Sequence, residues 1–273
     1  MNTKLKILKD NLRKEKSMAI AFSGGVDSTF LLRVAHETLG EEILAITARS
    51  AAVPGWELAE AEAFCRQEGI RQVVFDANGL QAECFAQNPP NRCYFCKKGI
   101  FTRIREIALE HGIDCVAEGS NMDDMGDYRP GLAAVAELGV ISPLKEAGLH
   151  KEEIRELSRK LELPTGDKPS YACLASRFVY GEPITQEKLA MVEAAEGFLL
   201  SCGFTQMRVR VHGEIARIEV LPEEMMRLME PRMRGAVEEK FRECGFAYVT
   251  VDMRGYRTGS MNETLTAQQK REG

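Results

Sequence analysis

The sequence lacks long hydrophobic runs and an apolar N-terminal segment of the kind that directs secretion. Within its 273 residues, no apolar stretch approaches the ~20 residues that a membrane helix requires. The segment Met1–Lys6 is polar and basic, unlike the apolar core of a signal peptide. We therefore expect a protein of the cytoplasm without membrane contacts. Repeats and low-complexity segments are missing too, so the chain is expected to fold into one large or two modest globular domains.

Positive charge is in the minority, because 36 Lys and Arg face 41 Asp and Glu and give a net charge of −5. This balance argues against nucleic acid as the main partner. Disulfides are rare in the cytosol. The eight cysteines are therefore expected to be core residues, catalytic thiols or metal ligands.

Strand and helix patterns alternate along the first 170 residues. This alternation predicts an α/β fold whose mostly parallel sheet carries helices on both faces. Ligands of such sheets bind at the carboxyl ends of the strands. A helix is predicted at 4–15, strands near 18–22, 43–48, 71–75, 114–117 and 139–142, and further helices near 28–39, 56–68, 95–110, 130–138 and 150–161.

The pattern changes after the Pro- and Gly-containing run at 164–169. A loop extends to about residue 183, and neighbouring strands then follow, which indicates a smaller α+β domain. Its predicted helices are 185–202 and 222–243, and its strands are 206–212, 214–220 and 246–252. We place the first domain at 1–170, the second at 171–259 and a polar tail at 260–273.

The most informative motif is Ser-Gly-Gly-Val-Asp-Ser at 23–28, between the first predicted strand and its helix. Two glycines allow a ligand to approach the backbone, and two serines add hydroxyl groups. The N–H groups and the dipole of the helix favour an anion there. We expect this anion to be the pyrophosphate part of a nucleotide, with Asp27 holding magnesium. The motif lacks the lysine of a Walker A loop, and an ordinary glycine-rich turn is the alternative.

Three cysteines lie in loop-like settings. Cys93 and Cys96 form a C-x-x-C run, and Cys173 lies in the loop after the first domain. Three thiolates without a fourth ligand suit a [4Fe–4S] cluster with one open iron, which can bind sulfide or a substrate; dithiol redox chemistry is an alternative. The remaining cysteines fall mostly in predicted helices or strands and are expected to be inert: Cys65, Cys84, Cys115, Cys202 and Cys244. Together, the loop and the thiols suggest that ATP activates an oxygen that sulfur then replaces.

The chain resembles a known family along nearly its whole length. The 23–28 motif resembles the signature of the PP-loop ATP pyrophosphatases, and further strings resemble the LarE-type sulfurtransferases, which act on pyridinium-3,5-biscarboxylic acid mononucleotide. These strings are 118–121 (EGSN), 127–131 (DYRPG), 176–178 (SRF), 208–210 (RVR), 216–219 (ARIE) and 255–259 (GYRTG), together with Cys173.

The resemblance implies an ATP- and magnesium-dependent reaction. A carboxylate of the mononucleotide would be adenylated with release of pyrophosphate, and sulfur would then displace AMP to give a thiocarboxylate, twice per substrate. The product is the precursor of the nickel-pincer nucleotide. Some family members sacrifice the sulfur of one cysteine, whereas others hold a [4Fe–4S] cluster with three cysteines. Cys93, Cys96 and Cys173 favour the cluster type, and sacrifice of Cys173 is the alternative.

The resemblance and the sequence also suggest roles for individual residues. Contact with the nucleotide is expected for Arg49, Ser50, Asp127 and Arg129. The alternative is a solvated loop for Arg49 and Ser50, and a surface ion pair for Asp127 and Arg129. The expected contacts to ATP and magnesium are Ser23, Gly24, Gly25, Asp27, Ser28, Arg49, Ser50, Gly119, Ser120, Asp127 and Arg129.

A second set of residues is expected to serve the mononucleotide. Arg177 beside Cys173 is expected to steady the reacting carboxylate, and Arg208, Arg210 and Arg257 to bind the substrate phosphate. Glu196 and Glu219 match family positions that bind a metal at a subunit interface, and pairing with the arginines is the alternative. The resemblance also implies a homo-oligomer, whereas the sulfur donor is not indicated.

Three other functions remain open. A tRNA thiolase of the same superfamily would need a basic RNA-binding surface. An ammonia-using, amide-forming enzyme would leave the three cysteines outside regular elements without a role. A non-enzymatic nucleotide- or metal-binding module would release no pyrophosphate.

Overall fold

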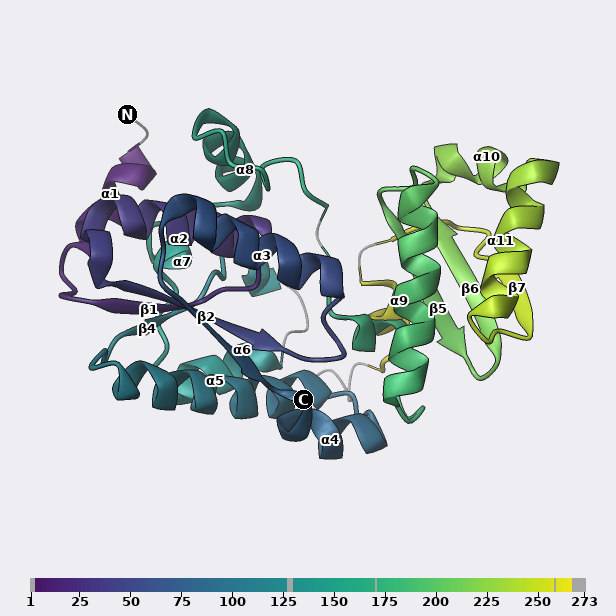
Figure 1. The fold of residues 1–273 in the computed structure, drawn as a ribbon, viewed down its shortest axis with the longest axis horizontal. Coiled ribbons are helices and arrows are strands. Elements are labelled where there is room, and N and C mark those ends of the chain that lie inside the picture. Colours follow the sequence, from purple (N-terminus) through teal and green to yellow (C-terminus); the bar gives the residue numbers. More distant parts are fainter. Residues whose placement is uncertain (1–2, 127–129, 170, 258, 267–273) are drawn as a thin grey trace. The chain divides into compact units, whose positions relative to one another are not determined.

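The computed structural model describes residues 3–126, 130–169, 171–257 and 259–266 (Figure 1). The chain divides into two compact units. Unit 1 comprises Met1–Gln81 and Asn91–Tyr171, and unit 2 comprises Ala82–Pro90 and Ala172–Gly273. In the part of the chain that is described, no helix has both the length and the apolar character needed to cross a membrane.

Unit 1 is built on a parallel four-stranded sheet, as the alternating pattern predicts. The strand order is β3-β2-β1-β4, and each neighbouring pair is parallel. The strands are β1 (Met18–Ala21), β2 (Ile43–Arg49), β3 (Gln72–Asp76) and β4 (Val116–Ala117). Helices cover both faces of the sheet, so β1, β2 and β4 are mostly buried apolar runs, whereas the edge strand β3 is half-buried.

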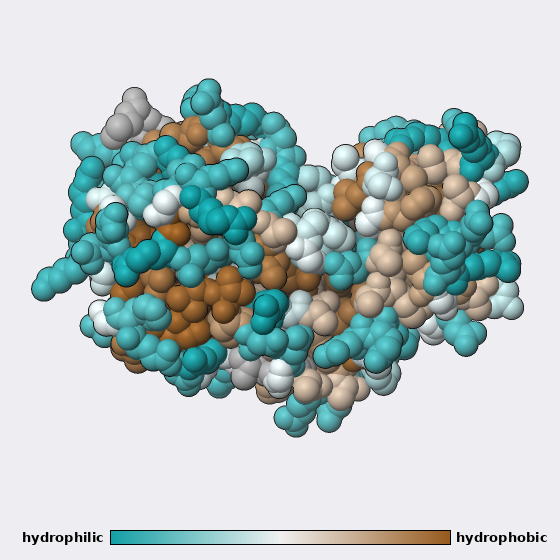
Figure 2. Space-filling view, in the orientation of Figure 1, coloured by the Kyte–Doolittle hydropathy of each residue, from teal (hydrophilic) through white to brown (hydrophobic). Residues whose placement is uncertain are grey.

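Helices cover the two faces of this sheet (Figure 1). One core cluster joins the sheet to α1, α2, α3 and α8, and the other joins it to α5 and α6. Figure 2 shows apolar residues gathering in unit 1 along a band that Figure 1 places at the sheet, between α3 and α5. The helices are α1 (Thr3–Leu12), α2 (Val26–Leu39), α3 (Gly55–Glu68), α5 (Arg92–Glu110), α6 (Gly131–Glu137), α7 (Pro143–Glu146) and α8 (Lys151–Lys160).

Two segments near unit 1 differ from the prediction. Residues 139–142 form no strand, because the Val140 N–H donates to Val135 O at the end of α6 and Pro143 already begins α7. Only Ile141 bridges to β4, opposite Ala117. A helix absent from the prediction, α4 (Asn78–Gln87), follows β3 and runs from unit 1 into unit 2.

Unit 2 contains a three-stranded sheet in the order β5-β6-β7. β5 (Met207–His212) and β6 (Ile215–Val220) are antiparallel, and β7 (Tyr248–Val251) is parallel to β6. Helix α9 (Gln186–Ser201) precedes the sheet, and α10 (Met225–Met229) and α11 (Pro231–Glu243) lie between β6 and β7. The α/β class with a smaller α+β part is confirmed. The single helix predicted at 222–243 is wrong, because Pro231 starts a new helix after Glu230.

The segment Ala82–Pro90 belongs to unit 2 although it lies early in the sequence. The Asn88 amide donates to Val179 O at 2.8 Å and to Glu182 O at 3.0 Å, and the Gly181 N–H donates to Asn88 O at 2.9 Å. Asn88 is fully buried and has a φ of 44°. Its side chain therefore provides the donors for two loop carbonyls that lie far away in the sequence.

Candidate functional site

The Ser23–Ser28 loop joins β1 to α2 at the carboxyl end of the sheet, as expected. The two serine hydroxyls lie 3.1 Å apart, and the Ser28 hydroxyl also donates to Gly25 O at 3.2 Å. The Gly25 N–H donates to the Ser23 hydroxyl at 3.4 Å. No side chain caps the N-terminus of α2, so its first-turn N–H groups are available to an anion.

Two glycines make this loop possible. Gly24 has a φ of 70°, and a Cβ there would meet Ala61 Cβ on α3 at 3.0 Å. Gly119, just after β4, packs closely against the start of α2. A Cβ at position 119 would lie 3.0 Å from Ser28 N and 3.3 Å from the Asp27 carbonyl carbon. Gly119 thus allows the end of β4 to lie directly against the loop.

Asp27 is the central acidic group of the loop. Its carboxylate contacts the Lys151 ammonium, and the Asn121 amide donates to its Oδ1 at 3.3 Å. Burial raises the pKa of the Asp27 carboxyl, the Lys151 contact opposes this rise, and the neighbouring Asp124 carboxylate adds to it. Two carboxylates and an amide are hard oxygen donors of the kind that magnesium prefers, so the residues fit the expected metal.

The segment after β4 and the start of α8 hold this arrangement in place. Asp123 accepts the Lys151 backbone N–H at 2.6 Å, and its other oxygen lies 2.8 Å from His150 Nδ1. The Asn121 N–H donates to Asp124 at 2.9 Å, and Asn121 Oδ1 accepts the Asp123 N–H at 2.9 Å. The backbone of Lys151 is therefore fixed independently of its side chain.

A second lysine contacts the loop from the segment after α8. Lys168 Nζ donates to Gly24 O at 3.2 Å and pairs with Glu60 at 2.8 Å. Arg155 supports this segment by donating to Gly166 O and Lys168 O. Two ammonium groups therefore flank the expected phosphate position.

The predicted nucleotide contacts on neighbouring strands have mixed surroundings. Ser50 follows β2 and is buried, and its hydroxyl accepts the Ala52 N–H at 3.2 Å. Arg49 is exposed and lies 3.8 Å from Asp76. The Ser120 hydroxyl and N–H both donate to the buried Glu118 carboxylate, at 2.7 and 3.1 Å. Asp127 and Arg129 lie outside the described residues.

The three candidate thiols are among the accessible ones. Cys93 and Cys173 are exposed and Cys96 is half-buried. Cys93 and Cys96 lie three residues apart near the start of α5, so their side chains share one helix face. By contrast, burial raises the pKa of the Cys65 and Cys115 thiols to about 12, with a further rise from Glu15 at Cys115, so both stay protonated at neutral pH.

Within the described ranges, no group of three or more His, Cys, Asp or Glu gathers as metal ligands do. Cys93 and Cys96 belong to unit 1, and Cys173 belongs to unit 2. The accessible pair on one helix face has the chemistry of two cluster ligands, and a cluster that also includes Cys173 stays a prediction.

The loop that carries Cys173 is held by the buried Arg177. Arg177 donates to Ala172 O at 2.6 Å and to Cys173 O at 3.1 Å. It also forms a two-pronged pair with Glu196 on α9, at 2.8 and 2.9 Å, with both side chains 1% exposed. Glu196 Oε1 accepts the Val209 N–H as well, at 2.9 Å. These contacts of Arg177 fix the Cys173 loop to α9 and, through Glu196, to β5.

Two of the predicted phosphate arginines, Arg208 and Arg210, lie on one face of the sheet in unit 2. The register places Arg208 opposite Glu219 and Arg210 opposite Arg217. Arg210 pairs with Glu219 at 2.9 Å and donates to Ser176 O and to the Ser260 hydroxyl. Glu219 also pairs with Arg217 at 3.0 Å. Glu196 and Glu219 thus both contact arginines, and a metal there would compete with guanidinium groups.

Arg208 and Arg257 differ in their surroundings. Arg208 is buried and lies over the Tyr256 ring, 5.1 Å from its centroid. Burial, and after it the nearby Arg177, lower the pKa of its guanidinium, whereas Glu196 opposes this shift. Arg257 instead pairs with Asp252 at 3.2 Å and Glu263 at 3.1 Å.

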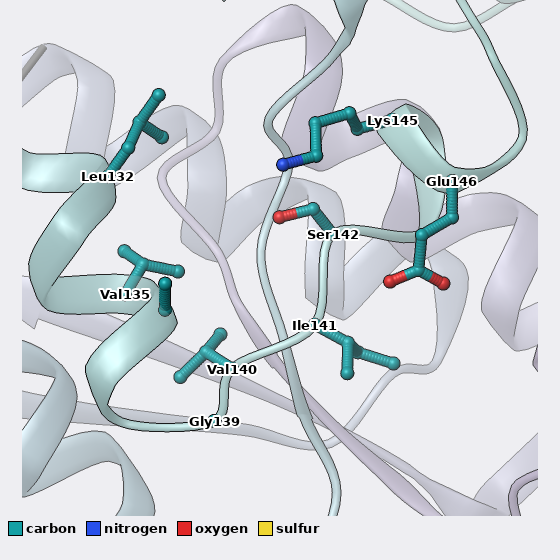
Figure 3. A pocket seen from close by; sticks show the side chains of 9 residues that line it. Leu132, Val135, Gly139, Val140, Ile141, Ser142, Lys145 and Glu146 are labelled. Carbon is teal, nitrogen blue, oxygen red and sulfur yellow. The ribbon is translucent and has the colours of Figure 1, made fainter. Parts of the chain in front are cut away.

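A hollow of about 270 Å³ lies elsewhere in unit 1, between α6 and the segment 139–146. Figure 3 shows Leu132, Val135 and Val140 on one side of it and Lys145 and Glu146 on the other. The Ser142 hydroxyl, which also lines the hollow, donates to Glu118 at 2.6 Å. The hollow is mostly apolar, and none of its lining residues belongs to the Ser23–Ser28 loop.

Sequence reasoning missed Lys151 and Lys168, which contact the Ser23–Ser28 loop, and the acidic residues Asp123 and Asp124 that follow Asn121. Lys151 and Lys168 lie 124 and 144 residues from their loop partners, and no local pattern connects such positions. The string EGSN at 118–121 contains Asn121, which contacts Asp27. Its position at the carboxyl end of a parallel strand was the available signal.

Several known proteins are similar in sequence to this chain over most of its length. No protein-family model matches the chain. It is 36% identical over 269 residues to the pyridinium-3,5-bisthiocarboxylic acid mononucleotide synthase of Lactiplantibacillus plantarum, covering 98% of this chain and 96% of that protein. It is 41% identical to an uncharacterized protein of Synechocystis sp., covering 97% and 99%. An argininosuccinate synthase of Haloarcula marismortui is 28% identical over 184 residues, covering 62% and 44%.

Proposed function

The chain belongs to the family of the pyridinium-3,5-bisthiocarboxylic acid mononucleotide synthases, and we propose that it is an ATP-dependent sulfurtransferase. Its substrate is the pyridinium-3,5-biscarboxylic acid mononucleotide, and its product is the corresponding thiocarboxylate in the synthesis of the nickel-pincer nucleotide. The observation that carries the proposal is the Ser23–Ser28 loop, with Asp27 flanked by Asn121 and Lys151.

In the first step, a substrate carboxylate oxygen attacks the α-phosphorus of ATP, and pyrophosphate leaves. The N–H groups at the start of α2 and the ammonium groups of Lys151 and Lys168 stabilise the charge that accumulates on the leaving group. Asp27 would hold magnesium, which would supply positive charge to the phosphate oxygens. Ser23 and Ser28 hydroxyls, with Gly24 and Gly25, keep the loop close to the phosphates.

In the second step, sulfur attacks the carbonyl carbon of the acyl adenylate, and AMP leaves with the C–O bonding electrons. Cys93, Cys96 and Cys173 are the proposed ligands of a [4Fe–4S] cluster, which supplies the sulfide when bound. Arg177 fixes the backbone at Cys173 through its two carbonyl contacts.

The same reaction with a sacrificed cysteine is the alternative. The Cys173 thiolate would attack the acyl adenylate and displace AMP, forming a thioester. Loss of the Cα proton would then break the Cβ–S bond, leaving dehydroalanine at 173 and the thiocarboxylate product. The exposure of Cys173 is compatible with this route.

The mononucleotide phosphate is assigned to Arg208 and Arg210, with Arg257 as a third contact. Support comes from the shared sheet face of the first two and from the ability of guanidinium groups to bind phosphate with two hydrogen bonds. Arg49, Ser50, Gly119, Ser120, Asp127 and Arg129 remain proposed nucleotide contacts. We further propose a cytoplasmic homo-oligomer that acts on a small molecule rather than nucleic acid, consistent with the net charge of −5.

The test measures pyrophosphate release from ATP with and without the pyridinium substrate under anaerobic conditions, after incubation with iron and sulfide. We expect substrate-dependent release, and an iron content that falls in Cys93→Ser and Cys173→Ser but not in Cys244→Ser, whose thiol pKa burial raises. Pyrophosphate release at the same rate with and without the pyridinium substrate would reject the proposed reaction. A colourless, iron-free protein that still makes thiocarboxylate would favour the sacrificial route.

A further inference from the structure

The Lys151 side chain occupies the place where a cation is required. Its ammonium contacts Asp27, and the two side chains are 27% and 23% exposed. Asp124 adds a second negative charge nearby, enough to raise the pKa of the Asp27 carboxyl further. Without the ammonium, two neighbouring carboxylates would repel each other in a partly desolvated site.

The backbone of Lys151 is fixed while its side chain can move. Asp123 accepts the backbone N–H at 2.6 Å, and the His150 N–H donates to Glu153 at 2.9 Å at the start of α8. The ammonium ends a flexible four-carbon stem with three donors that can rotate. It can therefore exchange one oxygen partner for another without disturbing the helix.

We propose that Lys151 holds the magnesium position at Asp27 in the nucleotide-free protein and transfers to a phosphate oxygen when the magnesium–nucleotide complex binds. This inference rests on the ATP site of the proposed function and adds a role to it. Asp27 then gains a divalent cation as it loses the ammonium, and the polyphosphate gains a cation from the protein.

Two consequences of opposite sign follow from the exchange. In the nucleotide-free protein, Lys151 competes with a divalent cation for Asp27, so its removal strengthens metal binding. In the nucleotide complex, Lys151 binds phosphate, so its removal weakens nucleotide binding. A side chain that only stabilised the loop would not strengthen metal binding when removed.

The test measures binding of Mn²⁺ to the nucleotide-free protein by electron paramagnetic resonance, and binding of magnesium–ATP by calorimetry, both at pH 8. For Lys151→Met we expect Mn²⁺ to bind about fivefold more tightly and magnesium–ATP about fivefold more weakly, the effect of one partly exposed ion pair. Lys151→Arg keeps the charge and should resemble the wild type in Mn²⁺ binding. Lys160→Met removes the same charge at the far end of α8, where Lys160 pairs with Glu156 on the surface, and should change neither.

Unchanged or weaker Mn²⁺ binding in a folded Lys151→Met protein would overturn the exchange, and so would a matching gain in Lys160→Met. A wild type that binds no magnesium–ATP would reject the nucleotide site itself. Neither measurement uses the pyridinium substrate or a sulfur donor, so failure of the sulfur-transfer reaction is recognised separately.

Discussion

Gly119 shows how a single missing side chain shapes the nucleotide loop. Its Cα lies so close to α2 that a Cβ would be 3.0 Å from Ser28 N and 3.2 Å from Ser28 Cα. Both contacts are backbone atoms of a helix start, which cannot move aside without shifting the loop. The first-turn N–H groups expected to bind phosphate would move with it.

Gly119→Ala is predicted to lower the free energy of unfolding by about 1–3 kcal/mol, the usual cost of forcing extra volume into a packed site. Binding of magnesium–ATP should weaken at the same time, because the shift reaches Asp27 and Ser28. Urea unfolding and calorimetry measure the two effects. A Cβ at Gly235 on α11 would meet nothing within 4 Å, so Gly235→Ala should be neutral or stabilise the protein by about 0.5–1 kcal/mol. A destabilisation by Gly235→Ala without one by Gly119→Ala would contradict the steric explanation.

Asp252 illustrates a carboxylate whose neighbours outweigh its burial. Burial favours the neutral acid, but the Arg254 N–H at 2.8 Å and the guanidinium groups of Arg257 and Arg217 lower the pKa below its ordinary value of 3.8. The unfolded chain therefore binds a proton more readily than the folded one. The resulting stabilisation is present above the ordinary pKa and is lost as the pH falls below it.

Asp252→Asn is predicted to destabilise the protein at pH 7 by about 1–3 kcal/mol, the range for hydrogen bonds to charged groups. The difference from the wild type should shrink as the pH falls below about 4, because the carboxyl of the unfolded chain then takes up a proton that the folded carboxylate still resists. Urea unfolding at several pH values between neutral and acid checks this. A difference that stays constant over this range would mean that the charge of Asp252 does not contribute.

At the scale of elements, the sequence predicts what local patterns determine. The apolar runs at 18–22 and 43–48 become β1 and β2 because buried parallel strands need little beyond continuous hydrophobicity, and the run at 71–75 becomes the half-buried edge strand β3. The run at 139–142 is also apolar but forms no strand, since α6 and Pro143 leave it only one bridging residue, Ile141. Competition from flanking elements is invisible in a local pattern.

Helix α4, which the sequence did not predict, is followed by residues that form long-range hydrogen bonds. The segment at the end of α4 packs into unit 2 through Asn88, whose amide bonds to Val179 O and Glu182 O, 91 and 94 residues away. The Ile184 N–H donates to Phe85 O at 3.0 Å. No pattern within 82–90 indicates these partners.

Asn88→Ala is predicted to destabilise the protein by about 2–4 kcal/mol, since it removes two partly buried hydrogen bonds and places alanine at a φ of 44°. Asn88→Gly removes the same donor but relieves the backbone strain, so it should cost about 1–2 kcal/mol less. Urea unfolding of the pair separates the two contributions. Equal losses would show that backbone strain at this position is negligible.

At the scale of the whole molecule, the family and the fold class could be predicted from the sequence better than the contacts. The family, the fold class and the position of the 23–28 loop agree with the structure and with the known relatives. The partners of the loop could not be predicted, because Lys151 and Lys168 reach it from beyond β4. In unit 2 the alternating arginines are visible in the sequence, but their pairing with Glu196 and Glu219 depends on how α9 and β6 pack beside β5.

The overall charge leads to a prediction about nucleic acid. Because the net charge is −5, the chain as a whole has no surplus of the positive charge that provides electrostatic affinity for nucleic acid. We expect no retention of bulk tRNA in filter binding at low salt. Salt-sensitive retention would instead support the tRNA thiolase alternative.

Sulfur transfer itself is tested most directly by following sulfur from protein to product. The anaerobically prepared protein is incubated with magnesium–ATP and the pyridinium-3,5-biscarboxylic acid mononucleotide. The masses of the small molecules and of the intact protein are then measured by mass spectrometry. We predict an ATP-dependent thiocarboxylate, equal amounts of AMP and pyrophosphate, and an unchanged mass at Cys173. AMP and pyrophosphate without any sulfur in the mononucleotide would contradict the proposed reaction.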